Sequence, residues 1–97
     1  MTIKKTQNGA DLTIALDGRL DTTTAPSLEN EFKTALNGIE HLTLDFSDLE
    51  YISSAGLRVL LSAHKKLGKG GMKVINANEI VREVFEVTGF ERVLNIE

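Results

Sequence analysis

Residues 42–61 read LTLDFSDLEYISSAGLRVLL, and this stretch decides the fold of the chain. Its first part alternates apolar and polar side chains with the period of a β-strand, which we expect over His41–Phe46. The next segment, Ser47–Ile52, is expected to form a loop. After it, side chains recur at helical spacing and predict an amphipathic helix over Ser54–Leu67. The stripe of this helix contains Leu57, Leu60, Leu61, His64 and Leu67.

Two strands are expected before this unit, at the start of the chain. Thr2–Gln7 and Leu12–Asp17 flank the pair Asn8-Gly9, which is a strong signal for a tight hairpin turn. We therefore expect these two segments to pair antiparallel. Gly18 is expected to end the second strand.

A helix is predicted next. Asp21–Thr24 supply side-chain oxygens that can accept hydrogen bonds from free helix amides, and Pro26 suits a first helical turn. Apolar residues recur at helical spacing through Asn37, where the pair Asn37-Gly38 is a stop signal.

The last third of the chain repeats the alternation of strand and helix. Met72–Ile75 is expected to be a short strand, Asn78 to cap a third helix that ends at Gly89, and Val93–Ile96 to be a final strand. The order β-β-α-β-α-β-α-β contains three strand–helix–strand units. It predicts the α/β class, with a mixed, mostly parallel β-sheet packed with α-helices.

The composition indicates one ordinary globular domain over residues 1–97, with 41% hydrophobic and 26% charged residues. The net charge is only −3, so direct binding of nucleic acid is not expected. The absence of cysteine excludes disulfides and thiolate metal sites. No apolar run is long enough for a secretory signal or a bilayer span, so we expect a cytoplasmic protein without membrane contact.

Motifs of catalysis are incomplete in this chain. Ser54-Ala55-Gly56 matches only half of a nucleophile elbow, because position 52 is Ile. His64 lies on the same predicted helix, about 15 Å from Ser54, which is too far to activate its hydroxyl. Gly68–Gly71 runs from helix to strand, the reverse of a phosphate-binding loop. No spacing resembles a metal site. We expect no enzymatic activity, no cofactor and no metal.

A hydroxyl at the start of the predicted helix is the most informative feature that remains. Ser53 or Ser54 is expected to cap the helix, a role worth about 1 kcal/mol that explains a serine there without any function. The same position also suits a phosphoryl group, because helix N-termini have unpaired amides and positive partial charge. Phosphorylation there would change what can dock on the surface.

Two segments of the sequence resemble a known family. Residues 16–25, LDGRLDTTTA, and residues 44–57, LDFSDLEYISSAGL, are similar to two characteristic segments of STAS domains of the bacterial anti-sigma-factor antagonist type. The first resembles the approach to the family's first helix, and the second resembles its phosphorylation loop. The order of elements and the length match as well, so the resemblance implies a single STAS-like domain over 1–97.

The resemblance also implies a site. Aligning Gly56-Leu57 with the family's Gly-Leu pair places the phosphoacceptor at Ser54. Ser53 stands where many members have Asp and is the alternative acceptor; a chain that has lost phosphorylation but still binds is a further alternative. The implied partner-binding residues are Asp21, Thr22, Thr23, Ser53, Ser54, Ala55, Gly56, Leu57 and Arg58.

The function implied by the resemblance is that of a switch protein without an active site. Such a protein binds an anti-sigma factor that is also a serine kinase and thereby releases the sigma factor. Phosphorylation with ATP and Mg²⁺ ends the binding, and a PP2C-like phosphatase restores it. A monomer is expected. The alternatives are a STAS interaction module in another regulatory complex, a ligand-binding module, a small enzyme, and a scaffold in which Ser54 only caps a helix.

Overall fold

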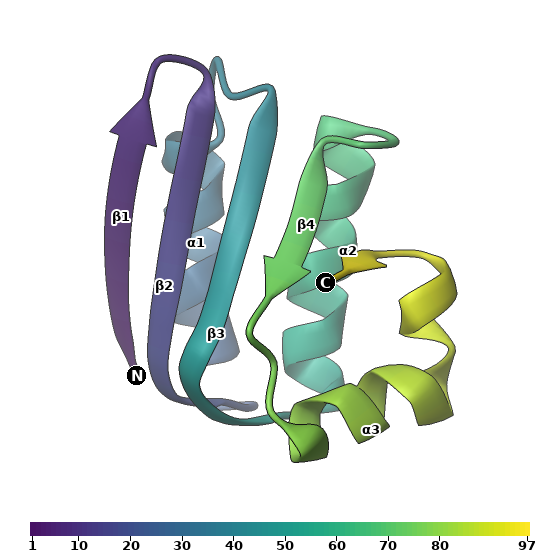
Figure 1. Cartoon of the computed structure of the whole chain (residues 1–97). Helices are drawn as coiled ribbons and strands as arrows, with labels where there is room; N and C mark the ends of the chain where they lie inside the picture. The colour runs from purple at the N-terminus through teal and green to yellow at the C-terminus, as the bar shows by residue number, and fades with distance from the viewer.

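The computed structural model describes residues 1–97 and contains one five-stranded sheet with helices packed against it (Figure 1). The strands lie in the order β1-β2-β3-β4-β5. The elements along the chain are β1 (Thr2–Asn8), β2 (Asp11–Leu20), α1 (Ala25–Ala35), β3 (His41–Ile52), α2 (Ser54–Leu67), β4 (Met72–Ile75), α3 (Glu79–Thr88), the 3-10 turn Phe90–Arg92 and β5 (Asn95–Ile96).

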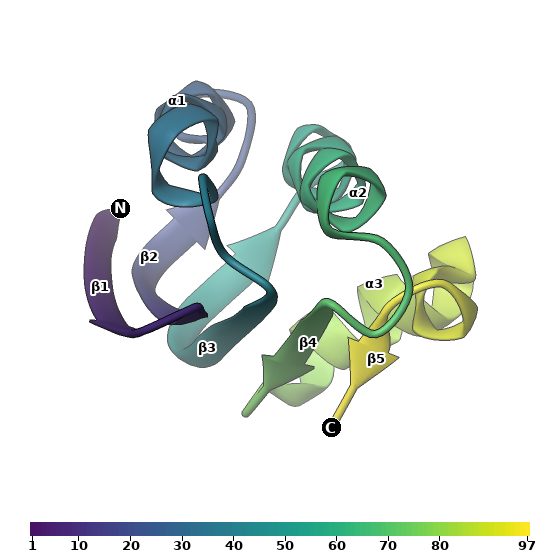
Figure 2. The same ribbon diagram turned by 90° about the horizontal axis from the view of Figure 1, so that it is seen from above.

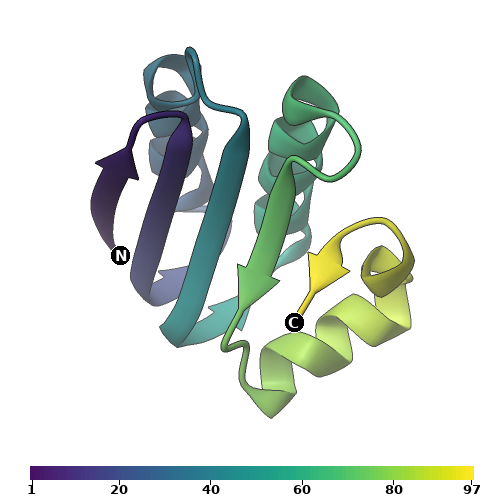
Figure 3. The same ribbon diagram turned by 45° about the horizontal axis from the view of Figure 1, so that its top comes forward.

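The pairing of the strands confirms the expected mixed, mostly parallel sheet. β1 pairs antiparallel with β2 through the hairpin at Asn8-Gly9, and every other neighbouring pair is parallel. Figure 2 shows α1 and α2 side by side on one face of the sheet. Figure 3 shows α3 beyond the end of β4, outside the layer formed by the other two helices.

The core lies between the sheet and the helices and contains 24 buried apolar residues in one cluster. Alternate residues of β2 and β3 point into it, as the period of two predicts. The third helix joins the same core, because the ring of Phe85 stacks on that of Phe46 with the ring centres 6.4 Å apart. The removal of these side chains from water is the main force that holds the layers together.

The strand β3 is longer than the sequence predicted. Ser47–Ile52 was expected to be a loop, but β3 runs without interruption to Ile52, so that expectation is wrong. The pairing with β2 shifts register after Asp45, which gives β3 extra residues opposite its neighbour. Beyond this irregularity, Leu49 and Ile52 are again buried, which stabilises the continued strand.

The second strand is also longer than predicted. Gly18 does not end it, because β2 continues to Leu20 with Gly18 at a φ of 112°, a conformation that favours glycine. The first helix ends at Ala35, two residues before Asn37. The last strand is shorter than the predicted Val93–Ile96, because the amides of Val93 and Leu94 donate to the carbonyl of Phe90 in the 3-10 turn.

Other local predictions are confirmed. The helix at Ser54–Leu67 and the strand at Met72–Ile75 have the expected bounds. The Asn78 side chain accepts from the Val81 amide at the start of α3, and Gly89 ends that helix in the left-handed conformation.

Candidate functional site

Two segments that follow neighbouring strands meet at one edge of the sheet. β2 and β3 are parallel, and their last residues, Leu20 and Ile52, are partners in the sheet. The Asp21 turn therefore lies beside the start of α2, although about 30 residues of chain separate them. The amide of Ser53 donates to the carbonyl of Leu20 at 2.9 Å, which joins the two segments directly.

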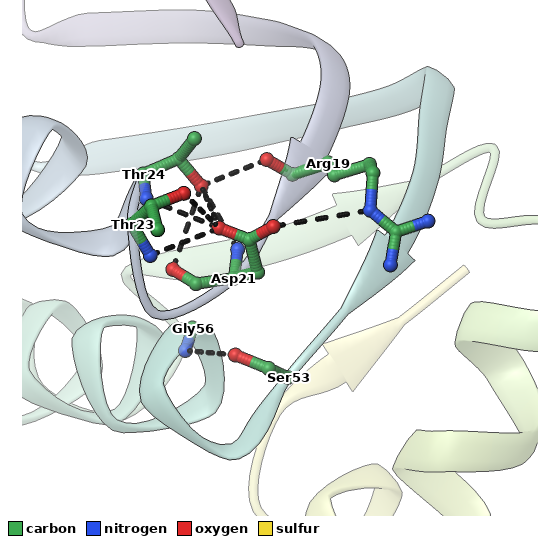
Figure 4. A network of polar contacts seen from close by, with 6 residues as sticks. All are labelled: Arg19, Asp21, Thr23, Thr24, Ser53 and Gly56. Atoms are coloured by element: carbon green, nitrogen blue, oxygen red, sulfur yellow. Dashed lines mark hydrogen bonds and ion pairs between the residues drawn. The ribbon is translucent and has the colours of Figure 1, made fainter.

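Ser53 is the residue that caps α2. Its backbone is extended, and its side-chain oxygen accepts from the Gly56 amide at 3.4 Å (Figure 4). Its carbonyl accepts from the Leu57 amide at 2.9 Å, the first bond of the helical ladder. The capping role that the sequence left open between two serines therefore belongs to Ser53.

Ser54 is the first residue of α2 and is exposed. Its hydroxyl makes no hydrogen bond within the protein, in contrast to that of Ser53. The hydroxyl thus faces water beside the free amides and the positive end of the helix dipole. In this environment another molecule can reach it, and a negative group on it would be stabilised.

A glycine holds the start of α2 close to β2. A β-carbon at Gly56 would lie 2.7 Å from Cγ of Leu20 and 2.9 Å from Cγ1 of Ile52, distances that real β-carbons do not have. Only a residue without a side chain lets the first turn of α2 approach the ends of the strands this closely. The position of Ser54 is therefore determined by packing beneath it.

The Asp21 turn is organised by one carboxylate (Figure 4). Oδ1 of Asp21 accepts from the amide of Thr23 at 3.0 Å, from its hydroxyl at 2.7 Å and from the amide of Thr24 at 3.2 Å. The hydroxyl of Thr24 accepts from the Asp21 amide and donates to the carbonyl of Arg19, both at 2.8 Å. These bonds give the turn before α1 a defined shape without a side-chain cap on Thr24.

Hydrogen bonding favours the ionised form of this carboxylate. The Thr23 hydroxyl is the largest influence that lowers the pKa of Asp21 below 3.8, and the amides of Thr23 and Thr24 act in the same direction. Nε of Arg19 lies 3.8 Å from Oδ2 of Asp21, and its guanidinium lies 4.8 Å above the ring of Tyr51. The turn thus presents a fixed negative charge next to a stacked cation.

A second carboxylate with a lowered pKa lies on β3. The hydroxyl and amide of Ser47 donate to Asp45, and they lower its pKa below 3.8 together with the Asn76 side chain. Asn76 reaches Asp45 from a turn in which its φ is 61°, a left-handed conformation that asparagine adopts more readily than most residues. This group stabilises the irregular part of β3.

A groove of about 190 Å³ connects the two segments of the site. It is lined by Thr22, Ala25, Pro26, Glu29, Ala55, Arg58 and Val59. Three of the residues predicted from the sequence, Thr22, Ala55 and Arg58, therefore share one depression. Glu29 was missed by sequence reasoning, and its only signal is that it is an exposed acid one turn into α1.

The predicted site residues differ in what they expose. Ser54 and Arg58 are exposed, whereas Gly56 and Leu57 are buried beneath them. Neither of the two buried residues presents a side chain at the surface.

Neither serine has a histidine partner. Nδ1 of His41 lies 2.9 Å from Oδ1 of Asp11, at the opposite end of β3 from the serines. His64 lies in the last turn of α2. No group of three or more His, Cys, Asp or Glu side chains is placed to share a metal ion. None of the helices is long and apolar enough to cross a membrane.

Comparison with known proteins identifies the family. The STAS domain model matches residues 2–97. The protein BtrV of Bordetella bronchiseptica is 39% identical over 82 residues, which are 81% of this chain and 71% of that protein. The role of anti-sigma factor antagonist is ascribed to BtrV. The anti-sigma-B factor antagonist of Bacillus subtilis is 27% identical over 92 residues, with 93% and 84% covered. The crystal structure of an anti-sigma factor antagonist from Mycobacterium paratuberculosis has a TM-score of 0.88 at 26% identity, with 98% and 83% covered. The chain therefore belongs to the STAS domain family, and its relatives are named as anti-sigma factor antagonists.

Proposed function

We propose that this protein is an anti-sigma factor antagonist that is switched off by phosphorylation of Ser54. It binds an anti-sigma factor that is also a serine kinase, and this binding releases the sigma factor. The observation that supports the proposal most is the free hydroxyl of Ser54 at the first residue of α2, in a chain whose relatives have this name.

The docking surface in this proposal consists of the Asp21 turn and the start of α2. Asp21, Thr22, Thr23, Ser54, Ala55 and Arg58 supply its exposed or partly exposed atoms. Ser53, Gly56 and Leu57 support it from beneath by capping and packing. The groove at Thr22 and Arg58 gives a partner side chain a place to enter.

Ser54 is favoured over Ser53 as the acceptor because their hydroxyls have different tasks. The Ser53 oxygen already accepts from the Gly56 amide, and a phosphate ester on it would disturb the cap. The Ser54 oxygen has no such bond and is exposed to an incoming kinase. Phosphorylation at Ser54 leaves the fold intact because the helix N-terminus tolerates negative charge.

The charge of a phosphate is sufficient to end binding. Shifting a complex from 99% bound to 1% bound requires about 5.5 kcal/mol. A phosphate adds about −1.5 to −2 charges, and each unit charge about 4 Å from a partner carboxylate costs about 4 kcal/mol at an effective dielectric constant near 20. A packed interface at Ser54 reaches the required range, whereas a fully hydrated surface position does not.

In this proposal residues 1–97 act as one STAS domain and have no catalytic site of their own. The kinase supplies ATP and Mg²⁺, and a PP2C-like phosphatase regenerates the active form. We place the protein in the cytoplasm as a monomer. It makes no direct contact with nucleic acid or membrane, because transient docking on a kinase requires neither.

Affinity capture from an extract of the native host, followed by incubation with ATP and Mg²⁺, tests the proposal. We expect capture of an ATPase of the histidine-kinase type and incorporation of one phosphate into the wild-type chain. Ser54→Ala should bind the same ATPase but incorporate no phosphate. Phosphate on Ser53 in this variant would move the acceptor to Ser53. Capture of a complex without a kinase or sigma factor would contradict the proposal and favour a STAS module of another regulatory assembly.

A further inference from the structure

One cation close to Ser54 has no partner in the protein. Arg58 is exposed on α2, and its guanidinium forms neither an ion pair within 4.0 Å nor a hydrogen bond. Two other arginines are engaged, since Arg19 stacks on Tyr51 and Arg82 donates to the carbonyls of Ala77 and Glu97 at 3.0 Å, whereas Arg92 is exposed and unpaired far along the chain. What distinguishes Arg58 is its position, because it is the unpaired arginine on the helix that begins with Ser54.

The helix geometry places Arg58 next to Ser54. The two residues are four positions apart in α2, which brings their β-carbons within about 5–6 Å of each other. Long side chains on a helix lean toward its N-terminus, which puts Ser54 within the range that the guanidinium of Arg58 can reach. A negative group four residues before a positive one is also the more favourable order of such a pair.

The acidic side chains near Arg58 leave its guanidinium free to bind an added anion. Glu29 lines the same groove from α1 but forms no ion pair with Arg58, and Asp21 already faces Arg19 and the threonines of its own turn. No other acid lines this groove. A phosphate on Ser54 would therefore be the strongest anion within reach of Arg58.

We propose that Arg58 binds the phosphoryl group of Ser54 and so acts as a positioning residue for the phosphorylated state. The inference rests on phosphorylation of Ser54 as proposed above. The guanidinium matches two phosphate oxygens at once, and the amides at the start of α2 face the same group. The pair holds the phosphate over the first turn of α2, on the side of the helix where Arg58 lines the groove.

The test uses the full chain with phosphoserine inserted at position 54 during translation, so that no kinase is needed. The second pKa of the phosphate is measured by ³¹P NMR titration. An ion pair worth about 0.2–0.5 kcal/mol corresponds to a shift of about 0.15–0.37 in the pKa of the phosphate. We expect the phosphate pKa to be higher by this amount in Arg58→Gln than in the wild-type background, and Arg58→Lys to restore part of the difference.

Lys66→Gln is the matched control, because it removes the same charge from an exposed position of α2 two turns away from Arg58. It should change the phosphate pKa much less than Arg58→Gln does. Equal shifts in the two variants, or no shift in Arg58→Gln, would overturn the proposal. Since the phosphate is encoded, these results do not depend on whether a kinase uses Ser54. A failure of kinase labelling would refute the proposed function and leave the Arg58 result standing.

Discussion

Gly56 lies against Leu20 so closely that a β-carbon at position 56 would be 2.7 Å from Cγ of the leucine. Leu20 is fully buried at the end of β2 and comes immediately before the Asp21 turn. Gly56 is in the first turn of α2, two residues after Ser54. This contact, together with the hydrogen bond from the Ser53 amide to the Leu20 carbonyl, sets the distance between the two halves of the proposed docking surface.

Gly56→Ala should destabilise the protein, although alanine is the better helix former by about 1 kcal/mol. The added methyl group overlaps Leu20 and Ile52, and overpacking of this kind costs about 1–3 kcal/mol. Chemical denaturation monitored by circular dichroism measures the free energy of unfolding. A variant more stable than wild type would show that the contact is not rigid.

A double-mutant cycle with Leu20→Ala separates the overlap from other effects. Leu20→Ala alone should cost about 2–5 kcal/mol because it leaves a cavity in the core. In the double variant the new methyl group has room, so the cost should be smaller than the sum of the two single costs. Additive costs would place the origin of the Gly56→Ala effect elsewhere.

Predictions from sequence succeeded where local signals decide the structure. The bounds of α2, the caps at Asn78 and Gly89 and the hairpin at Asn8-Gly9 all follow from side chains within a few residues. They failed for the second half of β3, since Ser47 and Asp48 look like loop residues. The strand continues there because of a register shift against β2, and the residues of β2 are distant in the sequence.

The candidate site shows the same division between features set by neighbouring residues and features set by distant ones. The sequence placed two serines at the start of a helix but left open which one caps it, because a helix boundary predicted from sequence is uncertain by at least one residue. The contact of Ser53 with Leu20 and the cap on Gly56 distinguish the two serines, and the first of these contacts is non-local. Glu29 was missed because its place in the groove depends on the packing of α1 beside α2.

The two serines should have different effects on stability. Ser53→Ala removes the cap of α2 and should cost about 0.5–1 kcal/mol, at the lower end for such caps because the bond to the Gly56 amide is long. Ser54→Ala removes a solvated hydroxyl and should change the free energy of unfolding by less than about 0.5 kcal/mol. Urea titrations of both variants measure this. Equal losses would mean that Ser54 shares the capping role.

Stability should fall in acid partly through Asp21 and Asp45. The Thr23 hydroxyl lowers the pKa of Asp21 in the folded state, and the Ser47 hydroxyl lowers that of Asp45. The unfolded chain therefore binds protons first as the pH falls. The stabilisation is complete above the ordinary Asp pKa of 3.8 and is lost as the pH drops through the lower folded values.

Asp21→Asn should accordingly flatten the pH dependence of the free energy of unfolding below about pH 4. Urea titrations at a series of pH values measure the slope. Asp48→Asn is the control for the loss of one negative charge, because Asp48 is exposed and its side chain makes no hydrogen bond. An Asp21→Asn slope identical to that of wild type would remove the Asp21 turn as a source of acid sensitivity.

A negative charge at position 54 should weaken binding to the partner kinase more than a neutral group of equal size does. Ser54→Asp and Ser54→Asn differ mainly in charge, and the exposed first turn of α2 accepts both without refolding. If the interface excludes water, the charge alone costs several kcal/mol, and even a partly hydrated contact costs about 1 kcal/mol or more. Asp has less charge than phosphate, so its effect is a lower bound.

Calorimetric titration of the wild-type chain and the two variants with the kinase measures these affinities. The dissociation constant should be lowest for the wild type, higher for Ser54→Asn and much higher for Ser54→Asp. The gap between the dissociation constants of the two variants should narrow as salt is added. A gap that salt does not change would mean that bulk at Ser54, not charge, drives release. Equal affinities for all three proteins would place the partner away from this end of α2 and remove the basis of the switch.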